Sequence, residues 1–245
     1  MTTAETTTFF TRAWSVYDQI AEHNYMSHRE IYAKVAGLLK LRKDHNQYRL
    51  LDLGCGNARF LAPCLMQSPP SHYHGVDMSE VALEEARTHL AELSCPIELT
   101  RGDLLEAVKS TDKKWDVIFT GFALHHLTSE EKARFFRAAG RCLSDNGWLL
   151  MVDIVREENQ GREDYLEDYL KLMRECWTQI PPDQLETACE HVATHDYPEY
   201  LSSLQEMAKV SGLNSSRVIG RYGQHCAVLF SRDALSDIGM ERATL

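Results

Sequence analysis

The sequence predicts a doubly wound α/β fold whose seven-stranded sheet is mainly parallel and ends in an antiparallel edge hairpin. Two observations lead to this prediction. Short apolar segments bounded by Gly, Asp or Pro alternate with helical patterns from residue 48 to residue 152, which is typical of a parallel sheet covered on both faces. Further along, RVIG and QHCAVLF are apolar runs joined by a short polar link, which favours an antiparallel pair.

The individual elements follow from the same patterns. Parallel strands are expected at Tyr48–Leu53, Tyr73–Val76, Ile97–Thr100, Trp115–Thr120 and Trp148–Val152. Helices are expected at Arg59–Gln67, Glu80–Leu93, Ser129–Leu143 and Glu199–Val210. Ser79 is a suitable N-cap for the second helix, in which Leu83, Ala86 and Leu90 recur at helical spacing.

Two segments fall outside this alternation within what we expect to be a single domain, residues 1–245. Residues 9–41 carry many aromatic side chains and predict an amino-terminal helical cap. Residues 154–197 contain the helical pattern EDYLEDYLKLMRECW, which Pro181 and Pro182 end. The apolar face of this helix either packs against the sheet or forms a lid over a pocket, and the sequence leaves both interpretations open.

Composition and charge restrict the possible partners. The 245 residues include 26 Lys and Arg against 36 Asp and Glu, a formal net charge of −10. Because nucleic acid and anionic membranes are bound through basic patches, we expect neither and favour a small partner. Seven scattered cysteines, no signal-type amino terminus and no long apolar run predict a soluble, reduced, cytoplasmic protein. The oligomeric state stays open.

The stretch LLDLGCGNARF, residues 50–60, is an apolar run that ends in an acid and two glycines. Gly54 and Gly56 allow positive φ and a close approach of the main chain to a ligand, although they can also simply mark a turn. With Asp77 ending the next strand, the pattern outlines a nucleotide-type site. Arg59 replaces the third glycine of a dinucleotide site, and a phosphate-loop G-K-[ST] is missing, which favours a ribose without phosphates.

Four motifs carry a resemblance to a known family. LDLGCGNARF, GVDMS, RGDLLE and WDVIFTGFALHHL, in this order over roughly residues 48–153, are similar to the motifs of class I S-adenosylmethionine-dependent methyltransferases. The resemblance implies a Rossmann-like methyltransferase fold with S-adenosylmethionine as cofactor.

The resemblance also implies how the cofactor is held, through backbone and carboxylate contacts to a cation-bearing nucleoside. It assigns Gly54 and Gly56 to the methionine part, Asp52 to its ammonium, Asp77 to the ribose, Met78 to the adenine face, Asp103 and Leu104 to the adenine amine, and Gly121 and Phe122 to the sulfonium. By analogy with related enzymes, Tyr17, Tyr25 and His28 would close the site. Alternatively, Asp103 is a loop acid, Asp52 a solvated strand-end acid, and the three aromatic residues belong to the core.

Methyl transfer needs a general base only where the acceptor has to lose a proton. His125 and His126 follow the fourth strand and Asp153 ends the fifth, so these three are the catalytic candidates, with helix-entry packing as the alternative. Tyr165, Tyr169, Met173 and Trp177 are the candidates for the acceptor walls. His191, His195, Asp196 and Tyr197 have no convincing metal-ligand spacing, and we expect no metal.

Three functions remain open. The first is methylation of a small molecule at oxygen or nitrogen. The second resembles carboxy-S-adenosylmethionine synthase, whose extra carboxylate needs a basic residue, for which Arg156, Arg162 and Arg174 are available. The third is a non-catalytic cofactor-binding subunit, which is expected to show a damaged glycine motif, whereas the motif here is intact.

Overall fold

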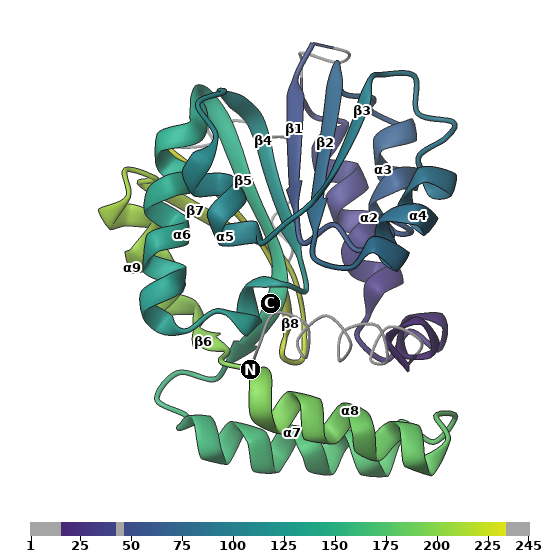
Figure 1. Cartoon of the computed structure of the whole chain (residues 1–245). Coiled ribbons are helices and arrows are strands. Elements are labelled where there is room, and N and C mark those ends of the chain that lie inside the picture. Colours follow the sequence, from purple (N-terminus) through teal and green to yellow (C-terminus); the bar gives the residue numbers. More distant parts are fainter. Residues whose placement is uncertain (1–15, 43–46, 234–245) are drawn as a thin grey trace.

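The structure is a computed structural model that describes residues 16–42 and 47–233. Its centre is a mixed sheet with the strand order β3-β2-β1-β4-β5-β8-β7 (Figure 1). The strands are β1 (Arg49–Leu53), β2 (His72–Asp77), β3 (Ile97–Arg101), β4 (Trp115–Gly121), β5 (Leu143–Arg156), β7 (Ser215–Tyr222) and β8 (His225–Ser231). Strands β1 to β5 are parallel, and β8 is antiparallel to both β5 and β7, which confirms the predicted fold class.

Helices cover both faces of the sheet (Figure 1). One group contains α2 (His28–Leu39), α3 (Leu61–Met66) and α4 (Glu80–His89), and the other contains α5 (Leu104–Ser110), α6 (Ser129–Cys142) and α9 (Leu201–Val210). In β1, Leu50 belongs to the apolar core of the first group and the next residue, Leu51, to that of the second. Because alternate side chains point to opposite faces and both faces are buried, the strand is apolar at consecutive positions.

Four details differ from the sequence prediction. Strand β5 is longer than expected, and the two-residue β6 (Glu199–Tyr200) pairs with its carboxyl end. Helix α5 was not predicted, and neither was α8 (Pro182–His195), which follows α7 (Arg162–Cys176). Pro182 starts this helix because proline lacks only an N–H that the first turn of a helix does not use.

Helices α7 and α8 lie side by side across one end of the sheet (Figure 1). Of the predicted amino-terminal cap, residues 9–15 lie outside the described residues, residues 16–22 are helical, and α2 follows. Among the described helices, none combines the length and the apolar character that a membrane span requires.

Candidate functional site

The glycine turn after β1 brings the main chain against the loop that follows β4. Gly54 and Gly56 have φ angles of +73° and +50°, a region that strongly favours glycine. A Cβ atom on Gly54 would lie 2.4 Å from the Cβ atom of Ala123, so a larger residue would collide there. The N–H of Gly56 donates to Oδ2 of Asp77 at 2.8 Å, which ties the turn to the end of β2.

The carboxylate of Asp77 is held by the backbone around it. Its Oδ1 accepts a hydrogen bond from the N–H of Ser79 at 2.9 Å. Burial raises the pKa of Asp77, and the bonds from Ser79 and Gly56 oppose that rise. Asp77 therefore stands in a fixed orientation at the carboxyl end of β2, where ligands of doubly wound sheets bind.

Asp52, near the end of β1, is a buried acceptor that is only half satisfied. Asp52 is 1% exposed. The hydroxyl of Tyr73 donates to Oδ2 at 2.6 Å, whereas Oδ1 has no hydrogen-bond partner among the described residues. Burial raises the pKa of Asp52 to about 7, against the opposing effect of the Tyr73 bond. Such an acceptor suits a cationic group of a ligand.

The other residues assigned to the cofactor gather at the same edge of the sheet. Met78, Asp103, Leu104, Gly121 and Phe122 all line the cavity described below. Asp103 is also the N-cap of α5, because its Oδ1 accepts the N–H groups of Leu105 and Glu106, each at 2.9 Å. Phe122 has a φ angle of +52°, which is rare for a bulky residue.

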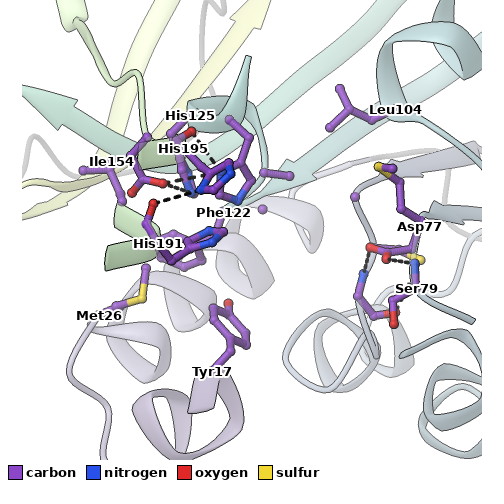
Figure 2. A pocket seen from close by; sticks show the side chains of 18 of the residues that line it. Tyr17, Met26, Asp77, Ser79, Leu104, Phe122, His125, Ile154, His191 and His195 are labelled. Carbon is purple, nitrogen blue, oxygen red and sulfur yellow. Dashed lines mark hydrogen bonds and ion pairs between the residues drawn. The ribbon is translucent and has the colours of Figure 1, made fainter. Parts of the chain in front are cut away.

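One cavity of about 530 Å³ joins these residues to α7 and α8. Figure 2 shows Asp77 and Ser79 on one side of it and His125, His191 and His195 on the other. The first side is called the cofactor side and the second the acceptor side. The volume falls within the range of small-molecule sites, roughly 300–1,000 Å³.

His125 and His126 lie on the short 3-10 helix η1 (Leu124–His126) that follows β4. Nδ1 of His125 lies 2.5 Å from Oδ1 of Asp153, and the His125 backbone N–H donates to the other carboxylate oxygen at 3.0 Å. Burial lowers the pKa of His125, but the charges of Asp153 and Asp196 outweigh it and raise the pKa. His126 is partly exposed, and burial together with the charge of His125 lowers its pKa.

Asp196, directly after α8, joins this histidine pair although the sequence analysis gave it no role. It is 1% exposed, and its Oδ1 lies 3.7 Å from Nε2 of His125 and 3.4 Å from Nδ1 of His126. Burial raises the pKa of Asp196, but the charges of His125 and His126 outweigh it and lower the pKa. His191 stands next to the cluster, with its ring centroid 5.2 Å from that of His126.

Of the three residues expected to close the site, one lines the cavity. Tyr17 does so, and its hydroxyl lies 2.9 Å from Nε2 of His28. His28 is buried behind it and stacks on Phe60 with 4.6 Å between ring centroids. Tyr25 stacks on Trp177 at 5.4 Å. His28 and Tyr25 therefore lie outside the cavity lining and pack against the lining residues Tyr17 and Trp177.

The four candidates for the acceptor walls are all buried. Tyr169 and Met173 of α7 and the following Trp177 line the cavity, and each is at most 2% exposed. Tyr165 lies behind them, with its ring stacked on Tyr169 at 5.4 Å. The hydroxyl of Tyr169 lies 3.1 Å from Nε2 of His225. These side chains are therefore part of the core and, except for Tyr165, of the cavity wall as well.

The glycine turn, the two carboxylates and the cavity at the carboxyl edge of parallel strands define a nucleoside-type binding site on a doubly wound fold. Residues 51–149 match a family model described as a methyltransferase domain. A phosphoethanolamine N-methyltransferase from Plasmodium falciparum is 25% identical over 199 residues, which cover 78% of this chain and 72% of that protein.

Two further comparisons, one of sequence and one of structure, agree with the methyltransferase-domain match. A carboxy-S-adenosyl-L-methionine synthase from Aeromonas hydrophila is 28% identical over 167 residues, covering 65% of this chain and 66% of that protein. An O-methyltransferase family protein from Burkholderia thailandensis has a similar fold, with a TM-score of 0.63 at 15% identity over 89% of this chain and 58% of that one. The match of residues 51–149 to a methyltransferase domain agrees with the class I S-adenosylmethionine-dependent methyltransferase that the motifs predicted, with S-adenosylmethionine as its cofactor.

The residues on the cofactor side fit this cofactor. The unsatisfied Oδ1 of Asp52 suits an ammonium group, and the fixed carboxylate of Asp77 suits a pair of hydroxyls. The bare backbone at Gly54 allows a ligand to approach closely.

Proposed function

We propose that the protein transfers the methyl group of S-adenosylmethionine to an oxygen or nitrogen atom of a small acceptor with a mainly apolar body. The observation that carries this proposal is the continuity of the cavity. It runs from the glycine turn to the pair His125 and His126 and on to the walls formed by α7 and α8. Such a covered site favours a small molecule over a folded protein or a nucleic-acid duplex. In this proposal the segment 154–197 acts as the lid.

The chemistry of the acceptor side supports an apolar acceptor. Its lining includes Val16, Ile20, Met26, Ile154, Met173 and Val192. Tyr169 and Trp177 add aromatic faces that can contact a ring or an amine. Among the described lining residues Arg59 is the only Lys or Arg, and its 40% exposed guanidinium faces Asp18 at 3.8 Å. The lining therefore provides no buried Lys or Arg for a phosphate or carboxylate, which argues against a phosphomonoester acceptor such as phosphoethanolamine.

Positioning and exclusion of water are the main tasks of the chain in this reaction. When bound, S-adenosylmethionine supplies an electrophilic methyl group on a sulfonium, which already carries a good leaving group. Asp52 would pair with the ammonium, Asp77 would accept from the ribose hydroxyls, and Phe122 would border the sulfonium. The buried wall from Tyr169 to Trp177 would keep water away from the acceptor.

A hydroxyl or ammonium acceptor also has to lose a proton, and the histidine pair is suited to receive it. Because the carboxylate of Asp153 can only accept, Nδ1 of His125 carries the proton between them, and Nε2 is the basic nitrogen. His126 has a lowered pKa, so it is neutral near pH 7 and able to take up a proton. Asp153 is a positioning residue that holds the ring of His125.

The carboxy-S-adenosylmethionine alternative needs a basic residue that faces the cavity, and the three candidates are engaged elsewhere. Arg156 donates to the carbonyl oxygens of Pro198 and Gln160. Arg162 donates to those of Asp196 and Ala193. Arg174 pairs with Glu186 on the surface. We therefore favour methylation of a separate acceptor.

The test is formation of S-adenosylhomocysteine by the purified protein with a panel of apolar phenols and amines and, separately, with phosphoethanolamine. We expect turnover with members of the apolar panel and none with the phosphomonoester. His126→Gln should reduce kcat while leaving cofactor affinity unchanged, and an exposed histidine on the surface, His23, serves as the matched control. Turnover of phosphoethanolamine alone, or an unchanged kcat in His126→Gln, would overturn the corresponding part of the proposal.

A further inference from the structure

We propose that His125, His126 and Asp196 form a binding site for a divalent transition-metal cation on the acceptor side of the cavity. One ring nitrogen from each histidine and one oxygen of Asp196 lie within 4.8 Å of one another. Two imidazoles and a carboxylate form a ligand set that zinc and its neighbours prefer. Since all three residues line the cavity, a fourth coordination position would face a bound molecule, as in catalytic rather than structural metal sites.

Asp196 provides the observation that points to a ligand. Its Oδ1 is buried and has no hydrogen-bond donor among the described residues. The two nearest candidates, the His125 and His126 ring nitrogens at 3.7 and 3.4 Å, stand further away than a good hydrogen bond requires. A buried carboxylate oxygen in this state has a substantial energetic cost unless a cation meets it.

Asp153 prepares His125 for the same role. It accepts the Nδ1 proton of His125, so the lone pair of the ring lies on Nε2, which is the nitrogen that faces Asp196. When the ring of His125 is neutral, two acceptors, Nε2 and the Asp196 oxygen, face each other across 3.7 Å. A carboxylate behind a ligating histidine is a recurring feature of metal sites because it fixes the ring and increases its basicity.

The two distances from Asp196 to the histidine nitrogens suit a tetrahedral cation. Ligand atoms about 2.1 Å from a tetrahedral zinc lie about 3.4 Å apart, close to the 3.4 and 3.7 Å found between Asp196 and the two histidines. Magnesium prefers an octahedral set of oxygen ligands, which this cluster does not supply. We therefore assign the site to Zn²⁺ or Co²⁺. Because Asp153 fixes His125, the partly exposed ring of His126 is the one that would adjust.

The use of the cation rests on the proposed function, whereas its binding does not. An acceptor hydroxyl on the open position would become more acidic, as water does on catalytic zinc. Because the histidine nitrogens would then hold the cation, the proton of the broken O–H bond would pass to the solvent instead of to them, and the oxygen electron pair would form the new bond to the methyl carbon. The bond from that carbon to sulfur would break with its electron pair staying on sulfur.

The first experiment measures binding alone. The full-length protein is stripped with a chelator, dialysed and titrated with Co²⁺, whose visible absorption reports coordination number. We expect one equivalent to bind with the intense bands of tetrahedral Co²⁺, and Zn²⁺ to displace it. Asp196→Asn should weaken binding at least about tenfold, and Asp153→Asn about 10–100-fold, the range typical of partners behind the ligands.

The matched control is a second histidine group at the far edge of the sheet. His72 and His74 lie 3.6 and 3.8 Å from the carboxylate of Glu98, so this group could also take up cobalt. His74→Asn should leave the tetrahedral spectrum unchanged. If His74→Asn abolishes binding and Asp196→Asn does not, the cation belongs to the sheet edge and the proposal is wrong. Thermal unfolding of each variant verifies its fold, and His126→Gln replaces Asp196→Asn if the latter does not fold.

The outcomes for the site and for the function are separable. A tetrahedral Co²⁺ spectrum that depends on Asp196 supports the site even if every acceptor tested fails. Methylation that proceeds in the stripped protein at an unchanged rate, together with absence of Co²⁺ binding, would overturn the metal site and leave the proposed function standing.

Discussion

Replacement of Asp52 by asparagine should make the protein more stable and at the same time a weaker cofactor binder. The carboxyl group is buried, and burial raises its pKa to about 7, whereas an aspartate in an unfolded chain titrates near 3.9. The unfolded state therefore ionises first as pH rises. The contribution of the uncharged Asp52 carboxyl group to stability is fully present below pH 4 and is lost as the pH rises through about 7.

The size of the effect follows from the same two pKa values. A difference of about three pH units at 1.36 kcal/mol each places the cost of the buried charge at about 4 kcal/mol above pH 7. Asparagine removes the charge and still accepts the bond from Tyr73, but its amide hydrogens need partners at about 1–3 kcal/mol. We expect the free energy of unfolding of Asp52→Asn to exceed that of the unmodified protein by about 1–3 kcal/mol at pH 8, which raises Tm by several degrees. At pH 4 we expect no gain in stability.

Cofactor binding should change in the opposite direction. For the unmodified protein, calorimetric affinity for S-adenosylmethionine should rise between pH 5.5 and pH 7.5 as Asp52 becomes ionised, below the range in which an α-amino group loses its proton, about 8. In Asp52→Asn the affinity should be lower and nearly independent of pH. Tyr73→Phe removes the bond that lowers the pKa of Asp52, so the midpoint should move to higher pH.

The matched control for this prediction is Asp116, the second residue of β4, whose two carboxylate oxygens both accept hydrogen bonds. It accepts the N–H of Arg49 at 2.8 Å and the hydroxyl of Ser144 at 2.7 Å. Asp116→Asn should therefore lower stability. The reasoning would be refuted by a lower Tm for Asp52→Asn at pH 8. It would also be refuted if the affinity of the unmodified protein for S-adenosylmethionine did not depend on pH.

Three further predictions test other parts of the molecule. Gly54→Ala should cost about 2–5 kcal/mol, measured by urea unfolding, because it combines a positive φ with a 2.4 Å contact; Gly37→Ala, in α2 with open space around it, should stabilise by about 0.5–1 kcal/mol. Trp177→Leu should raise the KM for the acceptor more than the Kd for the cofactor, and lost stability with an unchanged KM would show that this side chain serves only the core. Arg174→Ala should leave both Tm and the product unchanged, since its pair with Glu186 is exposed. A changed product would revive the carboxy-S-adenosylmethionine alternative.

The sheet could be predicted from the sequence because local patterns determine most of it. A run such as Leu50 and Leu51 is apolar at consecutive positions only when both faces of the strand are buried, so a parallel sheet was the natural prediction. Helix α8 was missed because Pro181 and Pro182 were interpreted as an end rather than a start. Both roles are compatible with proline, and the surrounding sequence does not distinguish them.

That the residues assigned to the cofactor lie together at one edge of the sheet was predictable for a different reason, since they sit at strand ends in a fixed order. The pairing of Asp196 with His125 and His126 has no such signal. The pairing depends on where α7 and α8 return the chain to the histidine pair. His195, the residue before Asp196, contacts His126 across 69 residues of sequence. A sequence pattern cannot report a contact that tertiary packing alone creates.

This division also bears on specificity. The matched family region, residues 51–149, contains the glycine turn, Asp77 and the histidine pair. It does not contain Asp153, Asp196 or the walls from Val16 to Met26 and from Tyr169 to Val192. Relatives whose names give different acceptors can therefore share the first set without sharing the second. It follows that the acceptor should be sought by varying the flanking segments: exchanging Met173 or Trp177 should change which acceptors are methylated, whereas exchanging Asp77 should reduce turnover of all of them alike.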